Sequence, residues 1–154
     1  MAENNQTGAG VVFHLEKIYT KDISYESPHA PHAFLENGAP DVSVQLSVAH
    51  GVLSDENGLH EVVLTVTVDA KHAGKTLFHV EVQQAGIFRL QNLPDGDLPK
   101  ALEIACPSIL LPFAREAISA LVEKGGFPQF LISPVNFEAL HQQKQAAGAP
   151  AASH

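Results

Sequence analysis

Strict alternation of apolar and polar residues in three segments constrains the fold of this chain more than any other feature of its sequence. The segments begin at Asp41 (DVSVQLSV), Glu61 (EVVLTVTVD) and Leu77 (LFHVEVQQ). Because successive side chains of a strand point to opposite faces, a period of two predicts strands with one buried and one open face, as in an antiparallel sheet. Turn-forming residues that begin at Asp55 (DENG) and surround Gly74 (HAG) separate these strands.

A fourth strand is predicted from Val11 to Glu26, where apolar and polar residues also alternate. We expect one face of this strand to be mainly apolar and to carry Phe13, Leu15, Tyr19, Ile23 and Tyr25. We expect the other face to be polar and to carry His14, Glu16, Thr20, Asp22, Ser24 and Glu26. Lys17 and Lys21 interrupt the apolar side, which favours a bend or a position at the sheet edge.

After Pro94 the apolar residues recur at helical spacing. Ser108 is predicted to cap a helix that runs to Lys124, where Gly125 and Gly126 end it. An apolar stripe along this helix would pack on the sheet.

Pro107 and Pro112 predict a kink near the start of this helix, because proline lacks the N–H group that a helix requires. Asn136 is predicted to cap a second helix that carries Phe137 and Leu140. Since the strands precede the helices, the sequence predicts an α+β fold. We expect a four-stranded antiparallel β-sheet followed by one long, kinked helix and one short C-terminal helix.

The length of 154 residues suits one domain, which we assign to residues 11–145. Residues 1–10 and 146–154 are poor in large apolar side chains, so both segments are predicted to be disordered. The chain has one cysteine, Cys106, and its first residues do not form an apolar leader, so we expect a cytoplasmic protein.

Charge and composition exclude several classes of partner. The net charge is −8, from 17 acidic and 9 basic residues, and such a surface repels nucleic-acid phosphates and anionic lipids. No apolar run approaches the roughly 20 residues that span a bilayer. We therefore expect neither a nucleic-acid partner nor insertion into a membrane.

No catalytic, metal or cofactor motif accompanies the nine histidines. The sequence contains no HExxH, P-loop or GxSxG motif, so we predict no enzymatic activity, no metal and no cofactor. His29 and His32 come nearest to a metal-ligand pair, but their proline-rich segment (PHAPH) places such side chains in solvent. Cys106 is expected to be a buried structural thiol.

Two kinds of surface remain as candidates for function. Asp22 and Glu26 lie on one strand face, roughly 13 Å apart, and Glu81 projects from another strand. This face is either simply solvated or a docking site for a basic partner. The sheet also offers more apolar surface than two helices can cover, so the surplus is either core, a self-association interface or a groove for apolar peptide.

Four long segments resemble one known family. They are Ile18–Phe34 (IYTKDISYESPHAPHAF), Glu81–Phe88 (EVQQAGIF), Cys106–Glu116 (CPSILLPFARE) and Gly125–Leu140 (GGFPQFLISPVNFEAL). The chain resembles the SecB family of bacterial protein-export chaperones from about residue 13 to about residue 143. The four segments occur in the same order as in that family. The resemblance implies an ATP-independent holdase that binds unfolded precursor proteins, delivers them to the motor SecA and assembles as a homotetramer, a dimer of dimers.

The resemblance also implies roles for individual positions. The positions that match the family's SecA-docking face are Asp22, Glu26 and Glu81. The positions that match its client groove are Val42, Val44, Leu46, Phe137 and Leu140. The positions linked to the oligomer interface are Val80, Val82, Gln84, Ile118 and Leu121.

This chain departs from the family pattern at two places. Many members carry a bulky apolar residue at the position of His141, so we expect a more polar end of the groove here. Nothing after Glu138 is acidic, which argues against a contribution of the tail to SecA binding. Two other classes remain as alternatives, a small enzyme that pairs a histidine such as His32 with a carboxylate, and a purely structural oligomerisation module.

Overall fold

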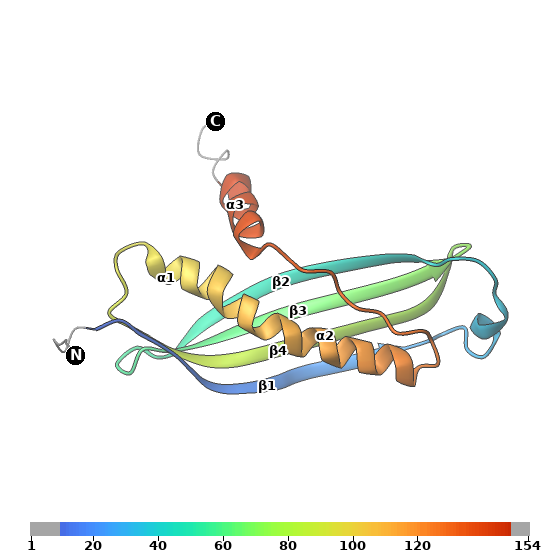
Figure 1. Ribbon diagram of the computed structural model, residues 1–154, viewed down its shortest axis with the longest axis horizontal. Helices are drawn as coiled ribbons and strands as arrows, with labels where there is room; N and C mark the ends of the chain where they lie inside the picture. The colour runs from blue at the N-terminus through green and yellow to red at the C-terminus, as the bar shows by residue number, and fades with distance from the viewer. Residues whose placement is uncertain (1–9, 149–154) are drawn as a thin grey trace.

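A four-stranded antiparallel sheet, covered by helices on one face, forms the body of the computed structural model, which describes residues 10–148 (Figure 1). The strands are β1 (Val12–Glu26), β2 (Asp41–Ser54), β3 (Leu59–His72) and β4 (Lys75–Gln91). Their order in the sheet is β1-β4-β3-β2, so β1 and β2 are the edges. The helices follow the strands, and the predicted α+β fold is confirmed.

The two central strands bury the alternating face that their sequences predict. The side chains on this face with no exposed surface are Val62, Leu64, Val66, Val68, Ala70, Val80, Val82 and Phe88. Burial of each such side chain contributes about 1.5–3 kcal/mol, so this face accounts for a large part of the free energy of folding. The side chains between them, on the opposite face, are half-buried and mostly polar.

The predicted faces of β1 are wrong at Tyr19 and Thr20. The register with β4 shifts between Leu15 and Lys17 and again between Thr20 and Asp22. Each shift inserts one unpaired residue, and this moves the following side chains to the other face. Tyr19 therefore lies on the open face. The edge position predicted from the two lysines is confirmed.

A continuous helical segment crosses the sheet (Figure 1). It comprises α1 (Asp97–Lys100), a π-helical turn η3 (Ala101–Ala105) and α2 (Cys106–Lys124), and a separate helix α3 (Phe137–Gly148) follows. A short 3-10 turn, η2 (His32–Leu35), lies between β1 and β2.

The start predicted for the long helix is wrong, because Ser108 lies inside it. The Ser108 hydroxyl donates to the carbonyl of Ile104 (2.6 Å) instead of capping a free end. The predicted kink corresponds to the π-helical turn immediately before Pro107, where an N–H group is missing. The predicted end is confirmed, since the Gly125 N–H donates to Leu121 (2.9 Å) and Gly126 has a φ of +90°.

One face of α2 packs on β3 and β4 through Leu110, Ala114, Ile118 and Val122, all fully buried. By length and composition alone, the segment Asp97–Lys124 is long and apolar enough to cross a membrane. The segment is apolar because one face of α2 packs on the sheet, as in the core helix of a folded domain.

The predicted cap of the last helix is confirmed, because the N–H of Ala139 donates to Oδ1 of Asn136 (3.0 Å). This helix extends to Gly148, so residues 146–148 of the expected disordered tail are helical. The rest of that tail, and residues 1–9, lie outside the described residues.

The end of α2 lies against β1 so closely that only glycine fits. A Cβ atom on Gly125 would overlap the hydroxyl group of Tyr25. We therefore expect Gly125→Ala to lower the free energy of unfolding by about 1–3 kcal/mol through overpacking, measured by urea denaturation. Gly51→Ala is the control, since a Cβ there would meet no atom within 4 Å. Equal stability of the two variants would contradict this packing.

Candidate functional site

Carboxylates from three strands gather at one end of the open sheet face. Glu81 pairs in register with Ser24, so it lies between Asp22 and Glu26, which flank Ser24 on the same face of β1. Asp69 of β3 joins them, because it pairs in register with His79 of β4. We call Asp22, Glu26, Asp69 and Glu81 the acidic face; Asp69 was not predicted.

His79 lies among these carboxylates. It pairs in register with Glu26 on one side and Asp69 on the other, and its Nδ1 donates to Asp69 Oδ1 (2.5 Å). The hydrogen bond with Asp69 raises the pKa of His79, and the charges of Asp69, Glu26 and Glu81 raise it further, although burial opposes them. The acidic face therefore carries a protonatable group that offsets part of its negative charge.

Glu16, expected on the same surface, does not belong to the acidic face. It pairs with Arg89 (2.8 Å) towards the other end of the sheet. Nearby, Glu61 accepts from the Tyr19 hydroxyl (2.5 Å) and pairs with Lys21 (3.0 Å). Burial and Glu61 raise the pKa of Tyr19 to about 12. Ion pairs thus neutralise this end of the open face.

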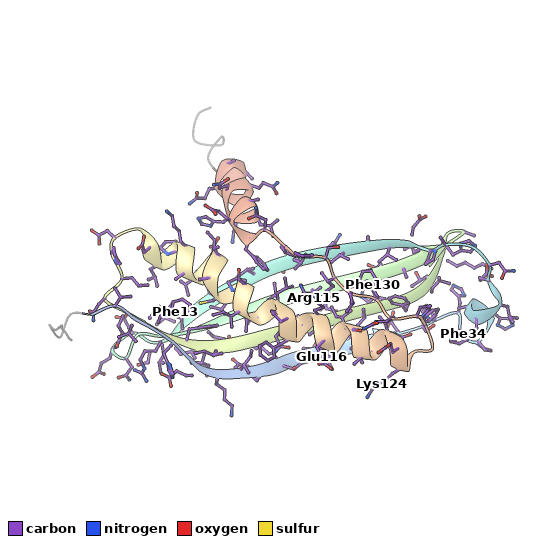
Figure 2. All side chains as sticks on the ribbon, in the orientation of Figure 1. Phe13, Phe34, Arg115, Glu116, Lys124 and Phe130 are labelled. Carbon is purple, nitrogen blue, oxygen red and sulfur yellow. The ribbon has the colours of Figure 1, made fainter. Side chains whose placement is uncertain are left out.

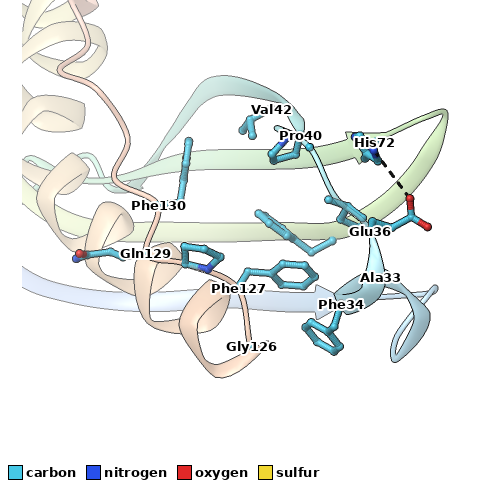
Figure 3. A pocket seen from close by; sticks show the side chains of 14 residues that line it. Ala33, Phe34, Glu36, Pro40, Val42, His72, Gly126, Phe127, Gln129 and Phe130 are labelled. Atoms are coloured by element: carbon cyan, nitrogen blue, oxygen red, sulfur yellow. Dashed lines mark ion pairs between the residues drawn. The ribbon is translucent and has the colours of Figure 1, made fainter.

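An apolar hollow of about 500 Å³ opens at one end of β2, between η2, β2 and the loop that follows α2 (Figure 3). Phe34, Phe78 and Phe127 form a continuous group of rings, with centroids 5.1 Å apart in each of the pairs Phe34–Phe127 and Phe78–Phe127. Phe130 and Val42 line the same hollow. We call this the aromatic hollow.

The loop that bears Phe127 and Phe130 is held along α2. The side chain of Arg115 projects from α2 (Figure 2). Its Nε donates to the carbonyl oxygen of Ile132 (2.9 Å), so this loop is anchored at its middle. Phe34 is 48% exposed, whereas Phe78 beneath it is buried. The aromatic hollow therefore has a fixed floor and an accessible rim.

A second hollow of about 240 Å³ lies between β2 and α3. It is lined by Leu46, Ser47, Val48, Glu103, Phe137, Leu140, His141 and Lys144. We call this the α3 hollow. It brings together three predicted groove residues that are far apart in sequence, although Phe137 is only 3% exposed and Leu140 is 38% exposed.

The five predicted groove residues thus divide between two places on the molecule. Val42 lines the aromatic hollow, and Leu46, Phe137 and Leu140 line the α3 hollow. Val44 is half-buried between them on β2. The aromatic rings are not among the positions that the resemblance matches to the client groove, and their signal in the sequence is their occurrence near proline in PHAF and FPQF.

The residues linked to assembly are mostly buried within the chain itself. Val80, Val82 and Ile118 have no exposed surface and lie between the sheet and α2. Gln84 is also buried, and its Nε2 donates to the carbonyl of Tyr19 (3.0 Å). Leu121 is half-buried on α2. The four buried side chains would affect an interface through the position of the elements that they support, whereas Leu121 keeps exposed surface of its own.

The titratable groups do not form a metal or catalytic centre in the described part of the chain. Within residues 10–148 no three His, Cys, Asp or Glu side chains are arranged to hold a metal ion. Burial raises the pKa of Cys106 to about 12, which makes its thiol a poor nucleophile. His32 lines a recess of about 30 Å³, which is too small for an enzyme substrate.

Comparison with known proteins identifies the family. A family model described as "Preprotein translocase subunit SecB" matches residues 5–148. This chain belongs to the SecB family. The chain is 53% identical over 134 residues to protein-export protein SecB of Acidithiobacillus ferrooxidans, covering 87% of this chain and 90% of that relative. It is 49% identical to SecB of Dechloromonas aromatica, over 98% of this chain and 97% of the relative.

A solved structure shares the SecB fold. It is the SecB-like chaperone Rv1957 of Mycobacterium tuberculosis in complex with a ChAD peptide from the Rv1956 HigA1 antitoxin. The TM-score is 0.67 at 12% sequence identity, over 81% of this chain and 91% of that one. The predicted family is thus confirmed, and with it a protein-export chaperone rather than an enzyme.

The pairing of His79 with Asp69 predicts a measurable titration. We expect Asp69→Asn to lower the pKa of His79, because the charged partner that favours the imidazolium is lost. In the unmodified protein this pair stabilises the fold below the unfolded pKa of histidine, and its contribution is lost as the pH rises through the raised folded pKa. NMR titration of the imidazole protons measures the shift, with Asp95→Asn as control. An unchanged His79 titration in Asp69→Asn would contradict the pairing.

Proposed function

We propose that this protein is a cytoplasmic holdase that binds extended apolar segments of unfolded precursors without ATP and delivers them to SecA. The observation that carries this proposal is the aromatic hollow, an accessible apolar cavity of about 500 Å³ on a protein of the SecB family. Its phenylalanine rings offer large apolar area with little directional chemistry, so they suit clients of varied sequence.

The positions of the two hollows suit an extended client. Val42 lines one and Val48 the other, and these positions are six residue steps, or about 20 Å, apart along the strand. An extended client segment of about six residues would therefore reach from one hollow to the other. Contacts in both would add, because the second contact is intramolecular once the first has formed.

The acidic face supports docking of a basic surface, which we assign to SecA. Asp22 and Glu26 are exposed on the open face, on the side of the sheet opposite α2. A basic partner would associate rapidly at low salt and more weakly as ionic strength rises. Because the acidic face and the hollows are separate surfaces, a client and SecA could be bound together.

We propose a homotetramer, a dimer of dimers, as the assembly. Two surfaces support self-association. On the edge strand β1, Phe13 and Ile23 are 40% and 46% exposed, and on α2 Phe113 is 47% exposed. Large apolar side chains on an unpaired strand edge and on the uncovered side of a core helix are typical of protein interfaces. Several copies would also present several hollows to one client.

Client capture is tested by suppression of aggregation of a slowly folding precursor without nucleotide. We expect suppression at a near-stoichiometric ratio. Val42→Ala combined with Leu140→Ala should weaken binding of an apolar unfolded peptide about fivefold, because each removes part of a hollow wall.

The matched control is Val52→Ala with Leu53→Ala, the same changes at exposed sites of β2 outside both hollows. Light scattering must show the same assembly for all variants. A wild-type protein that fails to suppress aggregation would favour a purely structural oligomerisation module. Equal affinity of the two double variants would overturn the assignment of the hollows.

Docking is tested by reversing charge on the acidic face. We expect Asp22→Lys with Glu26→Lys to weaken SecA binding more than tenfold at low salt, while peptide affinity stays unchanged. Titration calorimetry measures both. Asp55→Lys with Glu56→Lys, in the β2–β3 turn, makes the same change in net charge away from this face. An equal loss of SecA affinity in both variants would show that total charge, and not the acidic face, determines docking.

A further inference from the structure

Glu103 lies where three elements meet, η3, β2 and α3. Its Oε1 accepts a hydrogen bond from Nδ1 of His141 in α3 (2.9 Å). Its Oε2 accepts one from Nε2 of His50 in β2 (3.2 Å), and Nζ of Lys144 in α3 lies 3.6 Å from the same oxygen. One carboxylate thus links the C-terminal helix to both the sheet and the long helix.

This carboxylate is charged and largely shielded from water. The side chain of Glu103 is 17% exposed and that of His141 is 8% exposed. The hydrogen bond from His141 lowers the pKa of Glu103 more than any other contact. The hydrogen bond from His50 and the charge of Lys144 lower it further. Hydrogen bonds to a carboxylate are stronger than neutral ones, and partial burial reduces their screening by salt.

Little else fixes the position of α3. The helix has 12 residues and packs chiefly against η3, and beyond its first turns it projects away from the sheet (Figure 1). Phe137 is its one buried large apolar side chain within the described residues. A helix of this length is marginal in isolation, so its place depends on a few contacts near its start.

We propose that Glu103 is a positioning residue, which through His141 and His50 holds α3 against β2 and so keeps the two walls of the α3 hollow together. One wall is Leu46 and Val48 of β2, and the other is Phe137 and Leu140 of α3. This inference rests on the proposed function, since the α3 hollow is where part of the client would bind. The polar residue at position 141 thereby acts as a structural partner of a carboxylate.

Two measurements on the full-length protein test this role, amide hydrogen exchange within α3 and the dissociation rate of an apolar unfolded peptide. We expect Glu103→Ala and His141→Ala each to speed exchange in α3 at least tenfold and peptide dissociation about fivefold. Exchange in β3 and β4 should stay unchanged. His141→Asn keeps an N–H donor close to the position of Nδ1, so it should restore most of the protection that His141→Ala loses.

Glu56→Ala is the matched control, because Glu56 is an exposed glutamate in the β2–β3 turn. Unchanged exchange of α3 in both alanine variants would overturn the proposal. Faster exchange of α3 with an unchanged rate of peptide dissociation would also overturn it. So would exchange of α3 in His141→Asn that is as fast as in His141→Ala. A wild-type protein that binds no unfolded peptide would instead contradict the proposed function, while α3 exchange would still report whether Glu103 positions the helix.

Discussion

Burial of one face of β3 and β4 beneath α2 is the interaction on which the rest of this structure depends. Val66 and Val82 pair in register at its centre, and Leu110 and Ile118 cover this face from α2. Because strand side chains alternate strictly, fixing this face inward turns the other face outward. A single apolar contact layer therefore produces both the core of the chaperone and the open surface that carries its carboxylates.

The parts of the fold that follow from local periodicity could be predicted, and those that depend on pairing could not. Alternation identifies all four strands, and Gly125 marks the end of the long helix. Tyr19 was assigned to the wrong face because a bulge exists only relative to a partner strand. The sequence pattern predicts a cap at Ser108, but the helix continues before this residue through a π-helical turn that local periodicity does not show.

The candidate site shows the same division. Asp22, Glu26 and Glu81 were placed on one surface correctly, since they lie on polar faces of strands that prove to be neighbours. Asp69 and His79 were missed because their contact requires the register of β3 with β4. The hollows combine residues from segments up to about 100 positions apart, which local periodicity does not bring together. The resemblance to the family grouped some of them, but it did not divide them between two hollows.

The two bulges of β1 act as a pair. The first moves Ile18 to the helix-covered face, and the second returns Ile23 there, so Asp22 and Glu26 emerge on the outer side. If either bulge were deleted alone, the side chains along part of the strand would point to the opposite face of the sheet. Carboxylate side chains would then be buried in an apolar environment, or an isoleucine side chain would be exposed to water. Natural insertions and deletions in this strand should thus be tolerated chiefly in even numbers.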